Sequence, residues 1–315
     1  MTVHAPDSTA ITPTRSRALT PTRSRALWHG LIVAGLIFNV TLVVFWMPRL
    51  DMWIDARAWW TINLADLYGP GEQSLALIGA FRYAPVIAWL FYPATWLTWE
   101  QLIAVYLALS LAALWLLTGR RAPLFLAAFP PVLLELVNGN VHLFIALAIW
   151  AGLRWAPAGA TAWAFVLFTK VTSGVALVWF VARREWRNLG FALGATAAIA
   201  LVGVVLAPGL WAEWIRSLAI ASNVPPPPGV PPLIVRLPIA AAIAWYAGRT
   251  DRAWLVPVAA FVGLPIWWLQ GTAILTACFP LYWERERFRT GARTAEAMTA
   301  RNATLVRATE PEGRA

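Results

Sequence analysis

The sequence predicts an all-α, polytopic membrane protein, and three observations support that class. Of the 315 residues, 60% are hydrophobic and only 13% are charged, whereas a soluble domain carries about a quarter charged residues. Apolar runs recur along the chain between short polar breaks. Inside a bilayer each backbone amide needs a partner within its own segment, which favours helices. These observations predict a bundle of about nine to eleven transmembrane or re-entrant helices between residues 28 and 283.

The positive charge of the chain follows the breaks between apolar runs. A net charge of +10 would point to nucleic acid in a soluble protein, but here the arginines occupy alternate breaks, and arginine-rich segments stay in the cytoplasm. These breaks are residues 120–121, 154, 183–187, 249–252 and 284–289. The sequence therefore predicts a multi-pass plasma-membrane protein with both termini in the cytoplasm and no nucleic-acid partner.

Two tails flank the predicted membrane domain. Residues 1–27 contain an eight-residue segment that occurs twice in succession, and its arginines and prolines predict a disordered basic tail. The apolar run from Trp28 to Met47 is too long for the core of a cleavable signal, so it is predicted to remain as an anchor. Residues 284–315 are predicted to form a second basic tail in the cytoplasm.

Two breaks poor in positive charge, residues 48–82 and 208–232, are predicted to be external loops. The first carries Asp55, directly after the anchor and among tryptophans. The second contains Asn223 and a run of four prolines, which favours a stiff polyproline stretch, and Arg236 follows it. The outer side of the membrane thus gathers the polar features that suit chemistry.

One apolar segment, residues 83–99, fits two topologies. A full span would place residues 120–121 on the outer side, against the distribution of arginine. A re-entrant or interfacial segment, made irregular by Pro85 and Pro93, would restore that distribution. The sequence leaves both alternatives open.

Several later apolar segments are shorter than the roughly 20 residues that a spanning helix prefers. These segments are residues 122–137, 141–155, 157–169 and 171–181. Short helices interrupted by Pro or Gly are tolerated where they line a cavity or pack inside protein. The pattern predicts a cavity, which membrane enzymes and transporters share, but no inverted two-half repeat of the transporter kind is visible.

Asp55 is the candidate catalytic carboxylate. A carboxylate held at the outer membrane surface beneath tryptophans suits an enzyme that uses a lipid-linked sugar, because such a reaction needs a base for the acceptor hydroxyl. Arg57 and Arg82 flank the same loop. They either clamp a phosphate with paired hydrogen bonds or pair with acids and lipid headgroups.

Lys170 is the second candidate, since it alone among the 25 basic residues is a lysine. It lies within apolar sequence, where an ammonium group is costly and indicates function. The expected partner is the phosphate of a lipid-linked donor. A lysine at a helix end whose charge reaches the headgroups is the structural alternative.

A third cluster follows Glu135, an acid within a predicted span. Asn138 and Asn140 flank a glycine, and His142 follows closely. Carboxamides both donate and accept hydrogen bonds, which suits sugar hydroxyls, although Asn-Gly is also a common turn. Glu135 favours a polar cavity at this turn.

Several common sites are missing from the sequence. It has no phosphate-binding Gly-x-x-x-x-Gly-Lys loop and no His-Glu-x-x-His or Gly-x-Ser-x-Gly motif. Cys278 is the only cysteine, and the three histidines are scattered, so no disulfide framework, metal site or cofactor is expected. The donor is therefore expected to be lipid-linked and to approach from within the membrane.

The order of these motifs resembles the polyprenyl-phosphate-mannose-dependent α-mannosyltransferases, glycosyltransferase family 87 of the GT-C fold, from about Trp28 to Trp283. The similar segments are Asp55 with Trp59-Trp60, Phe81-Arg-Tyr-Ala-Pro85, Asn138-Gly-Asn140, Lys170 before a short helix, and Asn223 with Arg236. The chain departs from the family pattern where Asn140 replaces Gln, Ala84 replaces Pro, and Gln270 ends a segment that carries histidine in the family.

The resemblance implies an inverting transfer of a hexose, most simply mannose, from polyprenyl phosphate to a lipid or glycan acceptor in the cell envelope. Asp55 would accept the proton of the attacking hydroxyl, and cations would hold the departing phosphate. The residues assigned to substrate are Lys170, Arg57, Arg82, Tyr83, Asn138, Asn140, His142, Asn223, Arg236 and Trp268. A transporter or flippase of lipid-linked sugars is the alternative, but Asp55 lies beside a span rather than at mid-membrane.

Overall fold

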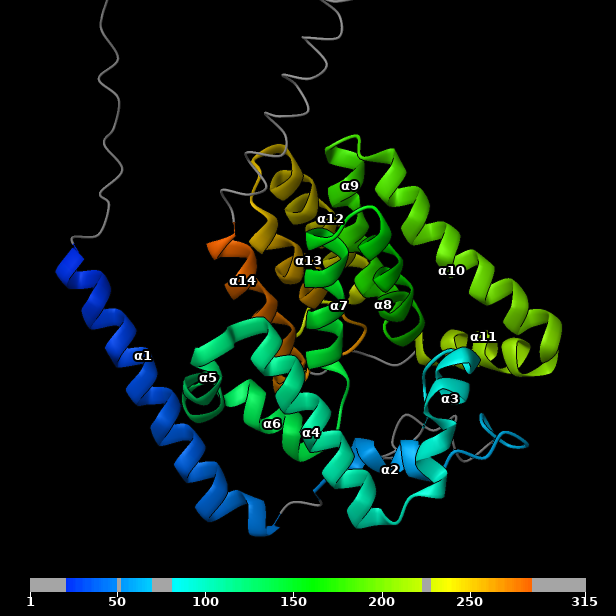
Figure 1. The fold of residues 1–315 in the computed structure, drawn as a ribbon, viewed down its shortest axis with the longest axis horizontal. Coiled ribbons are helices and arrows are strands. Elements are labelled where there is room, and N and C mark those ends of the chain that lie inside the picture. Colours follow the sequence, from blue (N-terminus) through cyan, green and yellow to red (C-terminus); the bar gives the residue numbers. More distant parts are fainter. Residues whose placement is uncertain (1–20, 50–51, 70–80, 223–227, 285–315) are drawn as a thin grey trace, which may run out of the picture.

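The computed structural model describes residues 21–49, 52–69, 81–222 and 228–284, in which every regular element is a helix (Figure 1). The α-helices are α1 (Pro21–Thr41), α2 (Ile54–Trp60), α3 (Pro85–Phe91), α4 (Trp99–Thr118), α5 (Ala122–Ala128), α6 (Pro130–Asn138), α7 (His142–Arg154), α8 (Trp163–Thr169), α9 (Val178–Ala182), α10 (Trp186–Leu206), α11 (Pro208–Ser222), α12 (Leu233–Arg249), α13 (Val256–Val262) and α14 (Cys278–Trp283). The predicted all-α class is confirmed.

Short 3₁₀ and π turns join several of these helices. A π-helical turn, Leu42–Trp46, extends α1, and the 3₁₀ segments are η2 (Met47–Arg49), η3 (Tyr92–Trp96), η4 (Gly119–Arg121), η5 (Ala158–Ala162), η6 (Val171–Leu177), η7 (Ala253–Leu255) and η8 (Leu269–Ala277). Short apolar segments predicted from the sequence, such as 157–169 and 171–181, therefore each consist of a 3₁₀ turn followed by a short α-helix.

Three helical stretches are long and apolar enough to cross a membrane: Ala26–Trp46, Trp99–Ala128 and Trp186–Leu206. Helices α6 and α7 together would make a fourth crossing, although the chain bends by 117° between them. The shorter apolar helices, including Ala158–Thr169 and Val171–Ala182, pack in the middle of the bundle (Figure 1). The protein is a polytopic membrane protein.

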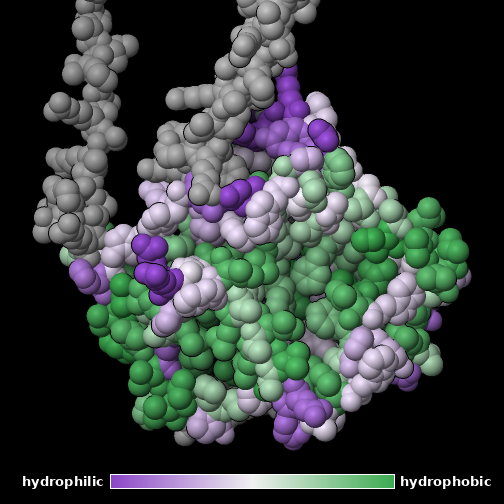
Figure 2. Space-filling model, viewed as in Figure 1, coloured by the Kyte–Doolittle hydropathy of each residue, from purple (hydrophilic) through white to green (hydrophobic). Residues whose placement is uncertain are grey.

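The outer helices present apolar side chains to their surroundings. Leu201 and Val205 of α10 are 65% and 72% exposed, and Figure 2 shows such side chains as a green band around the flank, with hydrophilic residues gathered towards the two ends. Lipid tails cover such a surface at no cost. The interior instead holds large aromatic side chains such as Trp163 and Trp179, which are buried.

The arginine-bearing breaks meet at one end of the bundle. The guanidinium of Arg121 lies over the ring of Trp283 at 5.1 Å, and Arg154 Nε lies 3.2 Å from Glu284 Oε2. Arg183 pairs with Asp251. This geometry agrees with the alternation of arginine that the sequence shows.

Residues 83–99 begin and end at the opposite end of the bundle, next to α2. The ring of Trp59 stacks on Tyr83 at 4.8 Å, and the ring of Trp60 contacts Trp99 at 5.3 Å. Between these contacts lie only the short helices α3 and η3. The segment therefore returns to the end where it began, which favours the re-entrant alternative.

The structure adds helical detail to the predicted N-terminal tail, the two predicted external loops and the predicted segment 122–137. Helix α1 begins at Pro21, so the predicted tail already contains its first turns. The two predicted external loops contain α2 and the fifteen-residue α11, both rich in tryptophan. The predicted segment 122–137 is broken at Phe129, because Pro130 and Pro131 have no N–H to continue the helix.

Asn39 of α1 repairs this break. Without amide hydrogens on Pro130 and Pro131, the carbonyls of Leu126 and Ala127 lose their usual partners four residues later. The Asn39 side chain is buried, and its Nδ2 donates to Leu126 O at 3.2 Å and to Ala127 O at 2.8 Å. A polar residue within a membrane helix is therefore explained by the backbone it satisfies.

We expect Asn39→Leu to lower the melting temperature of the protein in detergent. The leucine keeps the branched outline of the side chain but leaves two buried carbonyls without donors, which costs about 1–3 kcal/mol. Val40→Ala, at a 60% exposed position on the same helix, is the control and should change the melting temperature little. Equal melting temperatures for Asn39→Leu and the wild type would show that the break needs no partner from α1.

Candidate active site

Helix α2 is fixed against the end of α6 by its first residues. Trp53 precedes α2 in a left-handed conformation, with φ of 55°. Its backbone N–H donates to Val137 O at 2.6 Å, and its indole Nε1 donates to Leu136 O at 3.1 Å. Asp55 consequently lies in the first turn of a helix rather than in the polar loop that the sequence predicted.

Gly139 allows α2 and the α6–α7 turn to approach each other. Its φ of 75° favours glycine, and a Cβ there would lie 2.5 Å from the Cβ of Ala56. Its carbonyl accepts a hydrogen bond from Trp59 Nε1 at 3.0 Å. The Asn-Gly pair is thus a turn, as one alternative held, and the turn brings Asp55 to Asn140.

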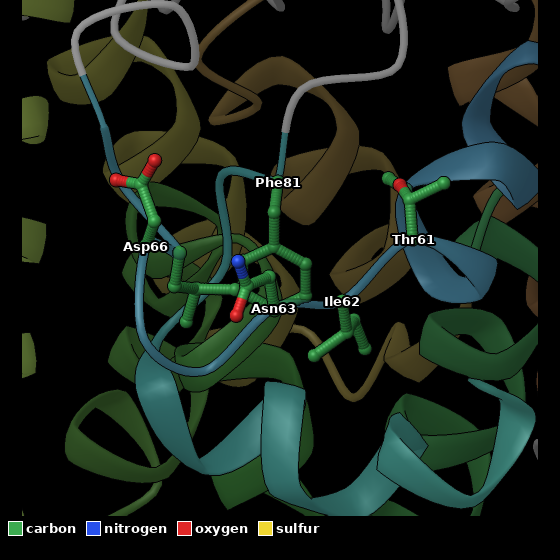
Figure 3. A pocket seen from close by; sticks show the side chains of 7 residues that line it. Thr61, Ile62, Asn63, Asp66 and Phe81 are labelled. Carbon is green, nitrogen blue, oxygen red and sulfur yellow. The ribbon is translucent and has the colours of Figure 1, made fainter.

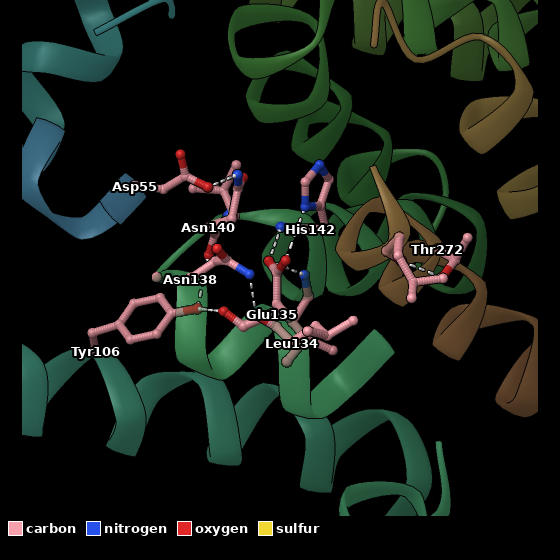
Figure 4. A network of polar contacts seen from close by, with 12 residues as sticks. Asp55, Tyr106, Leu134, Glu135, Asn138, Asn140, His142 and Thr272 are labelled. Atoms are coloured by element: carbon pink, nitrogen blue, oxygen red, sulfur yellow. Dashed lines mark hydrogen bonds and ion pairs between the residues drawn. The ribbon is translucent and has the colours of Figure 1, made fainter. Parts of the chain in front are cut away.

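Asp55 and Asn140 form the central contact of the site (Figure 4). Asn140 Nδ2 donates to Asp55 Oδ2 at 2.5 Å. Asn140 is 6% exposed, and its Oδ1 accepts from Val141 N at 2.7 Å and from the Tyr83 hydroxyl at 3.4 Å. With its amide oriented by these donors, Asn140 holds one carboxylate oxygen of Asp55, and Oδ1 of Asp55 has no hydrogen-bond donor among the described residues.

Tyr83 connects this contact to α8. Its ring lies between Trp59 of α2 and Lys170, whose Nζ is 4.9 Å from the ring centroid. Its neighbour Ala84 donates its backbone N–H to Phe168 O at 3.0 Å. Burial raises the pKa of the Tyr83 hydroxyl well above 10, and the negative charges of Asp55 and Glu135 raise it further. The hydroxyl therefore remains a donor at neutral pH.

Lys170 lies at the junction of α8 and η6. Its backbone leaves the helical conformation there, with φ of −139°. Burial lowers the pKa of its ammonium group, whereas the negative charges of Asp55 and Glu135 raise that pKa. No carboxylate of the described residues lies within ion-pair distance. The cation–π contact with Tyr83 is its main local partner in the described chain.

Glu135 and His142 form a second polar pair at the same turn. Both side chains are buried, and His142 Nδ1 lies 2.9 Å from Glu135 Oε2. Glu135 Oε1 accepts the backbone N–H groups of His142 and Leu143 at the start of α7. The acid within a predicted span is thus paired with donors rather than free.

Tyr106 of α4 was missed by the sequence analysis. Its hydroxyl lies 2.9 Å from Glu135 O and 3.0 Å from Asn140 O, so it supports the turn that carries both polar pairs. Nothing in the local sequence marks a tyrosine within an apolar helix for this role.

Other predicted site residues have different surroundings. Arg236 is 2% exposed and donates to the backbone carbonyls of Pro231, Val262, Leu264 and Pro265, with Trp267 beside its guanidinium. Asn138 Nδ2 donates to Leu134 O within its own helix. We therefore assign Arg236 to the packing of α12 against the end of α13 instead of to phosphate.

The remaining predicted residues lie at the edges of the site. Arg57 is exposed and Arg82 is half-buried, each with interactions of its own. Trp268 is 59% exposed and directly precedes η8. Asn223 falls outside the described residues.

A small pocket opens beside the C-terminal end of α2 (Figure 3). Its lining consists of Ala58, Thr61, Ile62, Asn63, Asp66, Leu67 and Phe81. The pocket shares Phe81 with the aromatic cluster around Trp59. Neither Asp55 nor Lys170 lines it.

Comparison with known proteins gives one match. A profile of glycosyltransferase family 87 matches residues 81–306, a stretch that includes Tyr83, Asn140, His142 and Lys170 and begins after Asp55. Neither the curated proteins nor the solved structures yield a significant match. Because the matched stretch covers more than half of the chain, the protein belongs to glycosyltransferase family 87 and is a membrane glycosyltransferase.

Proposed function

We propose that the protein transfers a hexose, mannose in the first instance, from a polyprenyl-phosphate donor to a lipid or glycan acceptor. The reaction takes place at the outer face of the plasma membrane, on a GT-C-like bundle. The proposal rests on one observation: Asn140 links the oriented carboxylate of Asp55 to the Tyr83 hydroxyl, and the ammonium group of Lys170 lies over the ring of the same tyrosine. A hydroxyl acceptor and a phosphate leaving group require such a pair of charges.

Asp55 acts as the general base in this proposal. Asn140 occupies Oδ2, and the partly exposed carboxylate keeps Oδ1 for the proton of the acceptor hydroxyl. As the hydroxyl oxygen of the acceptor attacks the anomeric carbon of the donor sugar, the bond from this carbon to the phosphate oxygen breaks on the opposite face. The proton passes to Asp55, and the electron pair leaves with the phosphate.

The surroundings of the second acid, Glu135, support an inverting transfer. A double displacement needs two carboxylates about 5 Å apart, one of them free to attack the sugar. Both oxygens of Glu135 face donors of its own turn and of His142, so Glu135 is not placed as a nucleophile. A phosphate leaving group needs no strong acid, and we propose a reaction without metal or cofactor.

The Asp55 end of the bundle is proposed to face outward. Asn63 and Arg252 are exposed near opposite ends of the bundle. In a Cys278→Ser background, Asn63→Cys should react with a membrane-impermeant thiol reagent in intact cells, whereas Arg252→Cys should react only after permeabilisation. Arg120→Cys is the control for residues 83–99, and its labelling in intact cells would contradict the proposed topology.

The proposed activity is tested by incubating the purified protein with radiolabelled polyprenyl-phosphate mannose and a membrane lipid extract. We expect a labelled product that requires the protein. Release of the lipid phosphate in step with product identifies a transferase, whereas uptake of the donor into vesicles without a new product identifies the transporter alternative. Polyprenyl-phosphate glucose serves as the competing donor and tests the assignment of mannose.

A further inference from the structure

His142 has a ring nitrogen that the fold leaves unused. Its Nδ1 faces Glu135 Oε2, and a carboxylate only accepts hydrogen bonds, so Nδ1 carries the proton. In the neutral ring, Nε2 is then an acceptor. No described residue donates to it, although the side chain is 3% exposed.

The unused nitrogen faces Gly271 of η8. A Cβ on Gly271 would lie 3.7 Å from Nε2, so η8 approaches this side of the ring to van der Waals distance. In Figure 4 the ring stands on the same side of the turn as the Asp55 carboxylate, with Asn140 between them.

We propose that His142, oriented by Glu135, determines specificity by accepting a hydrogen bond from one sugar hydroxyl of the donor or the acceptor. The inference rests on the proposed function. A hydroxyl fits because Nε2 needs a donor, which an ionised phosphate lacks. The negative charge of Glu135 also disfavours an anion beside this ring.

Two variants remove the hydrogen-bond acceptor at Nε2 of His142 and keep the α6–α7 turn. In His142→Asn, Nδ2 takes the place of Nδ1 and still donates to Glu135, but no atom replaces Nε2. In Glu135→Gln, the amide oxygen keeps the two backbone N–H groups, and its NH₂ faces Nδ1, which moves the ring proton to Nε2. Each should lower kcat/KM about tenfold, because a polar group is left unpaired in the complex. His29→Asn, on the exposed face of α1, is the matched control.

Monodeoxy analogues identify the hydroxyl. One analogue should react about tenfold more slowly than the natural substrate with the wild type, and equally with the wild type and His142→Asn. Its position in the donor series or in the acceptor series tells the two sources apart. A His142→Asn variant with wild-type kcat/KM, or with the same loss for every analogue, would overturn the inference.

Two results separate this inference from the proposed function. Transfer that requires Asp55 but not Nε2 of His142 overturns the inference alone, whereas transfer unchanged in Asp55→Asn overturns the proposed base. The ring tautomer is measurable without activity by ¹⁵N NMR of labelled histidine. A wild-type His142 with its proton on Nε2, or a Glu135→Gln variant without a shift of the proton to Nε2, also overturns the inference.

Discussion

Asp55→Asn is expected to lower the rate of sugar transfer by about 10²–10⁴-fold, the usual effect of removing a general base. The carboxamide has the shape of the carboxylate, and its oxygen still accepts from Asn140 Nδ2. The α2 contacts through Trp53 and Trp59 involve other atoms. The variant should therefore express, fold and bind donor like the wild type, so the loss should appear in kcat.

Asp66→Asn is the matched control, because Asp66 is an exposed acid a short distance along the same segment. It lines the small pocket instead of contacting Asn140. Single-turnover rates with saturating donor measure both variants. A normal rate for Asp55→Asn together with a slow rate for Asp66→Asn would move the base to the pocket beside α2.

The sequence could single out Asp55 as a candidate, because it is an acid close to the end of the first apolar run and among tryptophans. Its immediate structure could not be predicted. Helix α2 has only seven residues, too few to form without tertiary contacts. Its position depends on the close approach of Gly139 to Ala56, more than eighty residues away in the chain. A long-range backbone contact of this kind leaves no periodic signal.

Polar and charged residues also differ in how far the sequence reveals their partners. Arg236 was assigned to substrate through the resemblance to glycosyltransferase family 87, but here backbone carbonyls occupy its guanidinium. Any residue can supply a carbonyl, so the sequence does not reveal this partner. Asn39 is the opposite case. A pair of prolines in an apolar helix indicates two carbonyls without donors, and an asparagine in a membrane span indicates a donor that needs an acceptor. Both signals are visible in the sequence.

Lys170→Met should weaken donor binding by roughly 10- to 100-fold, because a hydrogen bond to a charged group contributes about 1.5–3 kcal/mol. The ammonium group is partly buried against Tyr83 and lacks an ion pair within the described chain. Methionine has a similar length and no charge to desolvate. The melting temperature of the donor-free variant should therefore equal or exceed that of the wild type, while stabilisation by added donor should largely disappear.

Two further variants separate a phosphate ligand from a structural lysine. Lys170→Arg retains the charge but replaces a compact ammonium group with a planar fork, so donor binding should be only partly restored. Arg216→Met removes one exposed cation from α11 and controls for the general loss of positive charge near the membrane surface. Donor titrations followed by the shift in melting temperature measure all three variants.

If Lys170→Met binds donor normally and melts at a lower temperature, the lysine anchors the α8–η6 junction, and the phosphate site must be sought around Arg57 and Arg82. Donor binding lost without loss of stability is the pattern that a phosphate ligand produces and an anchor does not, because an anchor acts on the empty protein as strongly as on the complex.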